Sequence, residues 1–177
     1  MDGVVLITGV MASGKSTVAQ ALAERLPRAA HVRGDAFRRM IVSGRADYAP
    51  DAPPDGEARA QLLLRHRQSA AAADAYAAAG FTAVVQDVVL GADLTAYVRL
   101  VRTRPLHVVV LAPSAEEVAR READRPKTGY GAWTVERLDE ELRTRTPRLG
   151  LWLDTGGWSV ERTVAAILAG RERARVA

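Results

Sequence analysis

The chain has 177 residues, enough for one domain with a substantial core, and 48 % of them are hydrophobic. It contains no cysteine, which excludes disulfides, thiolate metal sites and cysteine nucleophiles. Its net charge of +4 comes from a basic set in which only Lys15 and Lys127 are lysines. This balance indicates an arginine-rich composition and not a basic face for nucleic acid, although guanidinium groups also match phosphate oxygens.

The amino-terminal stretch MDGVVLITG has an acid where a signal peptide carries positive charge. Its apolar run is short and ends in glycine, so it predicts a strand. No stretch reaches the roughly 18 to 20 apolar residues that a membrane helix needs. We therefore expect a cytoplasmic protein with no membrane partner.

The predicted elements alternate between strands and helices. Apolar runs predict strands at residues 4–8, 31–34, 81–85, 106–111 and 150–154. Helical spacing and capping residues predict helices at 16–26, 35–41, 57–79, 94–102, 114–125, 135–145 and 159–172. This alternation predicts an α/β fold with helices on both faces of a five-stranded parallel sheet. No repeat or long linker divides the chain, so residues 1–177 are predicted to form one domain.

The stretch GVMASGKST, from Gly9 to Thr17, matches the phosphate-binding pattern G-x-x-x-x-G-K-S. It lies between an apolar strand and an amphipathic helix, which is the context that the pattern requires. Backbone amides and the helix N-terminus would hold phosphate oxygens. Lys15 would reach the β- and γ-phosphates, and the Ser16 hydroxyl would bind Mg²⁺. The predicted nucleotide-binding residues are Gly9, Met11, Ala12, Ser13, Gly14, Lys15, Ser16, Thr17 and, from a later helix, Arg121.

This loop by itself is shared by kinases, GTPases and motor ATPases. The chain shows no N-K-x-D-like base reader of a GTPase, and it is short for a motor ATPase. The small size and the five predicted strands favour the P-loop NTPase fold in its three-layer α/β/α, nucleoside-kinase-like form. ATP and Mg²⁺ are the expected cofactors.

Asp35 follows the second predicted strand, at the sheet edge where α/β proteins bind ligands. A carboxylate there can accept the proton of an acceptor hydroxyl during phosphoryl transfer. It can also orient the water around Mg²⁺, or serve only as the N-cap of the next helix. Asp35 is therefore predicted to be both catalytic and substrate-binding.

Asp87 ends the third predicted strand in AVVQDVVLG. A buried carboxylate needs a partner, which Mg²⁺, Lys15 or a substrate hydroxyl could supply, and a purely structural hydrogen bond is the alternative. Residues 43–57 hold three prolines, two glycines and four acids, so they predict a loop on the substrate side. Arg38 and Tyr48 are further predicted substrate contacts.

Arg121 and Arg125 lie four residues apart near the end of the helix that begins at Ser114, with Arg120 beside them. Arginines supplied in this way stabilise the charge of a transferring phosphoryl group. The loop that follows holds two glycines that can act as a hinge. Residues 120–133 therefore predict a catalytic lid, although a solvated helix face paired with Glu117 and Glu122 would give the same pattern.

Three stretches, GVMASGKST, RGDAF and VVQDVVLG, give the sequence a resemblance to the chloramphenicol phosphotransferase family of P-loop kinases. More distantly, it is similar to shikimate, gluconate and polynucleotide 5′-kinases. The resemblance implies that Asp35 is the base that activates the acceptor hydroxyl. It also implies that Ser16 binds Mg²⁺ and that the lid arginines contact the phosphates of ATP.

The leading hypothesis is thus an ATP-dependent kinase that phosphorylates a hydroxyl of a small molecule, such as an antibiotic. Its predicted catalytic residues are Lys15, Asp35, Arg121 and Arg125. A nucleic-acid 5′-end kinase is a second hypothesis, which predicts binding to oligonucleotides that depends steeply on salt. A nucleotide-dependent regulator without an acceptor is the third. The sequence leaves the acceptor and the oligomeric state open.

Overall fold

The computed structural model describes residues 1–49, 52–123 and 133–177. Its centre is a sheet of β1 (Val4–Gly9), β2 (Ala29–Arg33), β3 (Thr82–Gln86), β4 (Leu106–Leu111) and β5 (Leu151–Leu153). The strand order is β2-β3-β1-β4-β5, and every neighbouring pair is parallel. The predicted five-stranded parallel sheet is therefore confirmed.

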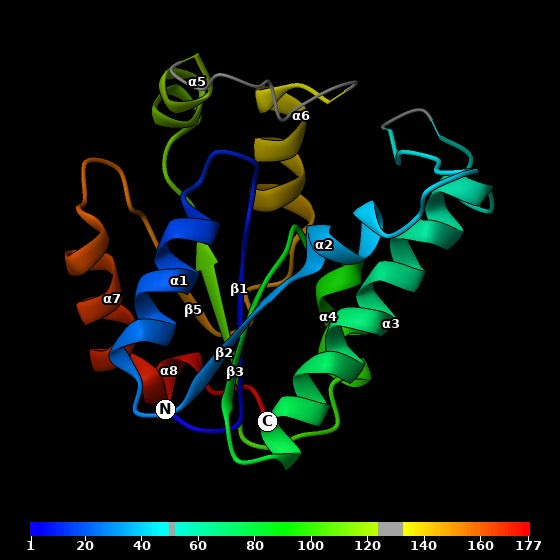
Figure 1. The fold of residues 1–177 in the computed structure, drawn as a ribbon. Helices are drawn as coiled ribbons and strands as arrows, with labels where there is room; N and C mark the ends of the chain where they lie inside the picture. Colours follow the sequence, from blue (N-terminus) through cyan, green and yellow to red (C-terminus); the bar gives the residue numbers. More distant parts are fainter. Residues whose placement is uncertain (50–51, 124–132) are drawn as a thin grey trace.

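Helices cover both faces of this sheet, as Figure 1 shows. On one face lie α1 (Lys15–Arg25), α7 (Val160–Ala169) and the short α8 (Arg171–Ala174), and on the other lie α3 (Glu57–Ala78) and α4 (Ala92–Leu100). Successive residues of β1 point to opposite layers. Val5 and Ile7 belong to the core beneath α1 and α7, whereas Leu6 belongs to the core beneath α3 and α4. Because both faces are covered, the strands read as continuous apolar runs.

The remaining helices gather near the carboxyl ends of the strands. These are α2 (Gly34–Arg39), α5 (Ala115–Ala123), α6 (Val135–Glu140) and the π-helical turn η1 (Glu141–Arg145). In Figure 1, α5 and α6 stand above the sheet, and both chain termini lie at its opposite edge. The parallel arrangement thus places the end of β1, the start of α1 and the start of α2 at one edge.

Three local predictions need correction. Asp35 does not cap α2, because that helix begins at Gly34 and its N-cap is Arg33. The single helix predicted over 135–145 changes to a π-helical turn at Glu141, where the Thr144 hydroxyl donates to the Glu140 carbonyl over 2.7 Å. The final predicted helix divides at Gly170 into α7 and α8.

No helix in the described ranges combines the length and the hydropathy that crossing a bilayer demands. All five strands lie in one sheet. The assignment of residues 1–177 to one domain, with a substrate-side segment at 43–57 and a lid at 120–133, stays a prediction.

Candidate active site

The phosphate loop connects β1 to α1. A Cβ at Gly9 would lie 2.4 Å from the Leu111 carbonyl oxygen at the end of β4, so only glycine lets the loop leave the sheet here. Gly14 precedes α1 with a φ of 92°. Lys15 begins the helix, is nearly buried, and donates from Nζ to the Val10 carbonyl over 2.6 Å. The loop is thus packed tightly against the sheet beneath it.

Most of the predicted nucleotide-binding residues line one cavity of about 1590 Å³. These are Met11, Ala12, Gly14, Lys15, Ser16 and Thr17, and Arg121 lines the same cavity. Gly9 and Ser13 belong to the loop but do not line the cavity. The Ser13 hydroxyl is buried without a hydrogen-bond partner among the described residues. Their part in nucleotide binding stays a prediction.

Arg121 of α5 reaches two loops that are far apart in the sequence. Its NH1 donates to the Ser13 carbonyl over 3.5 Å, and its NH2 donates to the Thr155 carbonyl over 3.1 Å. Glu117 accepts from its Nε over 2.7 Å and also pairs with Arg120. These contacts place the guanidinium against the phosphate loop. Arg125, the second predicted lid arginine, lies outside the described residues.

Asp35 lies in the first turn of α2 and lines the cavity. Its side chain is 48 % exposed and pairs with Arg39 one turn later, Oδ2 to NH2 over 2.9 Å. The ion pair leaves the second carboxylate oxygen of Asp35 open to a ligand. A half-exposed carboxylate on the same cavity as the phosphate loop has the access that a general base requires.

Asp87 also lines the cavity, but Arg65 of α3 holds its carboxylate on both oxygens. The Arg65 Nε donates to Oδ2 over 2.9 Å, and its NH2 donates to Oδ1. The sequence suggested Mg²⁺, Lys15 or a substrate hydroxyl as the partner of this buried acid, whereas the structure supplies Arg65. A Cβ at Gly34 would lie 1.9 Å from Asp87 Oδ2, so this glycine allows the close approach. A direct contact between Asp87 and a substrate stays a prediction.

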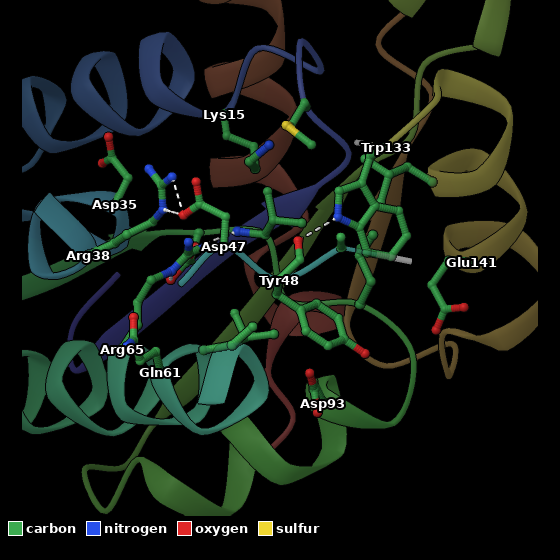
Figure 2. Close-up of a pocket in the computed structure, with 18 of the residues that line it drawn as sticks. Lys15, Asp35, Arg38, Asp47, Tyr48, Gln61, Arg65, Asp93, Trp133 and Glu141 are labelled. Carbon is green, nitrogen blue, oxygen red and sulfur yellow. Dashed lines mark hydrogen bonds and ion pairs between the residues drawn. The ribbon is translucent and has the colours of Figure 1, made fainter. Parts of the chain in front are cut away.

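The segment between α2 and α3 reaches over the cavity. Arg38 and Tyr48 both line it, as predicted, and the Arg38 Nε donates to Asp47 Oδ1 over 2.7 Å. This hydrogen bond is the main cause that lowers the pKa of Asp47 below its ordinary value. The Tyr48 carbonyl accepts from Trp133 Nε1 over 2.9 Å, and the two rings lie with centroids 6.1 Å apart (Figure 2). The segment is therefore hydrogen-bonded to Trp133, which lies two residues before α6.

Sequence reasoning missed a second bidentate pair on the cavity wall. Arg59 of α3 donates to both oxygens of Asp93 on α4, over 2.5 and 2.6 Å, and its guanidinium lies 5.6 Å from the Tyr48 ring. A signal was available, because Ala58, Gln61, Leu62, Arg65 and Gln68 repeat at helical spacing and all line the cavity. The helical spacing of these residues is visible in the sequence, but the residues that they face are not.

We call the part of the large cavity that lies away from the phosphate loop the distal cavity. It is lined by all the residues of the large cavity except Arg121 and those from Met11 to Thr17. Its described arginines are Arg38, Arg39, Arg59, Arg65, Arg137 and Arg145. Its described acids are Asp35, Asp47, Asp87, Asp93, Glu140 and Glu141. Five of these acids pair with five of these arginines, the fifth pair being Arg145 with Glu141 over 3.6 Å. In the described lining, the cationic excess comes from Lys15 and Arg121, beside the phosphate loop.

A smaller cavity of about 320 Å³ lies beside α5. It is lined by Ser114, Glu116, Glu117 and Arg120 and by Gly156 and Gly157 of the loop after β5. Arg121 contacts this loop as well as the phosphate loop. Arg121, which lines only the larger cavity, therefore links the phosphate loop to the loop that borders the smaller one.

The parallel sheet, the phosphate loop and the cavity at the strand ends define a P-loop nucleotide-binding protein. The chain belongs to the AAA domain family, whose model matches residues 4–147. A comparison with curated protein sequences finds no significant match.

Solved structures of kinases share the fold. A sugar kinase from Janibacter sp. HTCC2649 is 20 % identical, with a TM-score of 0.72 over 98 % of this chain and 96 % of that one. The APS kinase of Mycobacterium tuberculosis, solved with AMPPNP and APS, is 20 % identical, with a TM-score of 0.70 over 97 % and 98 %. The tunicamycin resistance protein of Deinococcus radiodurans is 18 % identical, with a TM-score of 0.64 over 96 % and 95 %. These similarities establish a common fold.

Proposed function

We propose that the protein is an ATP- and Mg²⁺-dependent phosphotransferase that moves the γ-phosphate to a hydroxyl of a small molecule. The observation that carries this proposal is that Asp35, an accessible carboxylate, lines the same cavity as Lys15, Ser16 and Arg121. A site that only bound or hydrolysed a nucleotide would not need the large distal cavity beyond the phosphate loop.

In the proposed reaction, the acceptor oxygen attacks the γ-phosphorus of ATP, and the bond from that phosphorus to the β–γ bridging oxygen breaks. ADP leaves, and the hydroxyl proton passes to the Asp35 carboxylate. Lys15 and Arg121 stabilise the negative charge of the phosphate oxygens. Arg125, predicted to assist them, keeps that role as part of the proposal.

The residues at the phosphate loop fit a magnesium ion held mainly by nucleotide oxygens and water. Ser16 offers a hydroxyl on the cavity wall, and no cluster of three or more potential ligands occurs among the described histidines, aspartates and glutamates. Mg²⁺ prefers this situation, since it keeps several waters and few protein ligands. When bound, it would neutralise charge on the phosphates. Asp87 is already occupied by Arg65, which leaves Ser16 as the proposed protein ligand.

The smaller cavity suits the base of the nucleotide. It lies between α5 and the loop after β5, and Arg121 joins that loop to the phosphate loop. Its two glycines permit a close approach of the backbone to a flat ring. We assign the adenine to this cavity, the phosphates to the loop at 9–17, and the acceptor to the distal cavity.

The resemblance to chloramphenicol phosphotransferases and the fold shared with a resistance protein support an antibiotic among the candidate acceptors. A role in antibiotic resistance belongs to this proposal, together with action in the cytoplasm. A polynucleotide end kinase receives less support, because the described arginines of the distal cavity are balanced by acids and five of them form ion pairs.

The test is the Asp35→Asn variant, assayed for ATP-dependent phosphorylation of hydroxylated antibiotics and sugars, with products detected by mass spectrometry. We expect kcat to fall by about 10²- to 10⁴-fold, the usual contribution of a general base, with little change in KM for ATP. Asp2→Asn is the control, because Asp2 is exposed, does not line the cavity and lies outside the predicted substrate-side segment. Undiminished transfer by Asp35→Asn would remove Asp35 as the base.

A further inference from the structure

The charges of the distal cavity limit what it can bind. Its described lining holds six arginines and six acids, and five of the acids are paired with arginines. An anionic acceptor group needs a cation whose charge is not already neutralised. Beside the phosphate loop, Lys15 and Arg121 line the cavity in addition to the six arginines, and no further acid of the described lining accompanies them. The described distal wall provides no comparable excess.

The two most buried ion pairs strengthen the case against an anionic acceptor in the distal cavity. Arg65 with Asp87 and Arg59 with Asp93 are each held by two hydrogen bonds, and their four side chains are between 2 % and 23 % exposed. A carboxylate or phosphate of an acceptor would have to displace a buried carboxylate and leave it unpaired, which is costly. The remaining N–H groups and carboxylate lone pairs suit hydroxyl and carbonyl groups, which bring no charge.

The distal cavity also has a wall of rings and aliphatic side chains. Of the three Trp, four Tyr and two Phe of the chain, Phe37, Tyr48 and Trp133 line it. Tyr48 and Trp133 lie together, with their ring planes tilted by 43°, and Figure 2 shows both among the labelled polar side chains. Leu62, Leu90 and Leu138 extend this wall. A flat, apolar ring would bury well against it.

We propose that the acceptor is an uncharged hydroxyl compound with an aromatic or similarly flat ring, of the aryl glycoside or nucleoside class, which packs against Tyr48 and Trp133. This inference rests on the proposed kinase function and narrows its substrate. Neutral hydroxyls meet the paired Arg59, Asp93, Arg65 and Asp87, and the ring meets the aromatic wall. Sulfated, phosphorylated and carboxylated acceptors are selected against.

The first test compares matched acceptors that differ only in charge. Binding of phenyl β-D-glucuronide methyl ester and of the free acid, and of uridine and uridine 5′-monophosphate, is measured by calorimetry on the full chain loaded with AMPPNP and Mg²⁺. We expect a neutral member to bind at least about tenfold more tightly than its anionic partner. Equal or tighter binding of the anionic partners overturns the inference, and so does a failure of both neutral compounds to bind.

The second test changes the cavity instead of the ligand. Asp93→Asn frees the charge of Arg59, so the neutral-over-anionic preference should fall by about tenfold, whereas Asp139→Asn should leave it unchanged. Asp139 is also paired with an arginine, Arg143 over 2.8 Å, but it does not line the cavity. An unaltered preference in Asp93→Asn would contradict the proposed role of charge balance.

The aromatic wall has its own control. Tyr48→Ala should weaken binding of the neutral acceptor by at least about fivefold with AMPPNP affinity unchanged, and Tyr48→Phe should restore most of it. Equal binding by both variants would reject stacking on Tyr48.

If neutral compounds bind but no phosphorylated product forms, the kinase proposal fails and the ligand class stands. If anionic compounds or 5′-hydroxyl oligonucleotides are phosphorylated in preference, the kinase proposal stands and the ligand class fails.

Discussion

The observed partner of Asp87 is Arg65, which differs from the metal or substrate that the sequence suggested. Asp87 directly follows the buried strand β3, and this position made it a candidate for metal or substrate binding. Its side chain is 2 % exposed, however, and its carboxylate is held by Arg65. The backbone amide of Val88 also donates to Oδ1 over 2.7 Å. The pair connects α3 to the end of β3. It therefore stabilises the wall of the proposed acceptor site.

Removing one member of this pair should leave the other charge buried. We expect Arg65→Met to lower the free energy of unfolding by about 3 to 5 kcal/mol, the usual cost of an uncompensated buried charge. Urea denaturation followed by circular dichroism measures it. Arg39→Met removes an exposed pair, 61 % and 48 % exposed, and should cost no more than about 1 kcal/mol. Equal losses in the two variants would show that burial does not control the energy of the Arg65 pair.

At the scale of elements, the junction of β2 and α2 decides where Asp35 lies. Gly34 begins α2, and its missing side chain lets the Asp87 carboxylate approach the helix from β3. The next residue, Asp35, is thereby carried to the cavity wall. The close packing of Gly34 against Asp87 thus fixes the position of Asp35, the proposed catalytic acid, which is the next residue in the chain.

Gly34→Ala should therefore displace α2, because its Cβ would lie 1.9 Å from Asp87 Oδ2. We expect a larger loss of thermal stability than in Gly44→Ala, where the added Cβ meets nothing within 4 Å and only the φ of +71° costs about 1 to 2 kcal/mol. The double variant Gly34→Ala/Asp87→Ala should lose less stability than the sum of the losses in the two single variants, since the two sites are coupled. Strictly additive losses would mean that no clash between them controls the position of α2.

At the scale of the whole molecule, three histidines couple folding to pH. Burial is the main cause that lowers the pKa values of His31, His66 and His107 below 6.5. His66 is 2 % exposed and lies edge-on to Tyr97 with ring centroids 5.7 Å apart. In the unfolded chain these rings would take up protons near their ordinary pKa, so acid favours unfolding.

We expect the free energy of unfolding to fall as the pH is lowered through about 6.5 toward the lower folded-state pKa values. The sign follows because the unfolded state binds more protons than the folded state across this range. Thermal melts between pH 8 and 5, chosen to bracket the ordinary histidine pKa of about 6.5, measure the effect, and His66→Phe should reduce the slope. A stability that rises on acidification, or an unchanged slope in the variant, would contradict this account.

The local features of the chain could be predicted from its sequence. The phosphate loop could be recognised because its glycines, lysine and serine occur at a fixed spacing. The strands could be predicted because buried parallel strands are continuously apolar. Both patterns depend only on residues that are neighbours along the chain, which is why they could be predicted. The structure confirms the α/β alternation and the five-stranded parallel sheet. The predicted N-cap at Asp35 was wrong by two residues, because the N-cap of α2 is Arg33 and capping depends on where the backbone turns.

The pairs of side chains that meet across the cavity became apparent from the folded chain. Arg65 and Asp87 are 22 residues apart, Arg59 and Asp93 are 34 apart, and Arg121 and Ser13 are 108 apart. No local pattern links such residues, because parallel strands with crossover helices bring distant segments to one sheet edge. The ionisable side chains were visible in the sequence, but their pairing was not. That pairing turns an arginine-rich composition into a nearly neutral distal cavity beside a cationic phosphate loop.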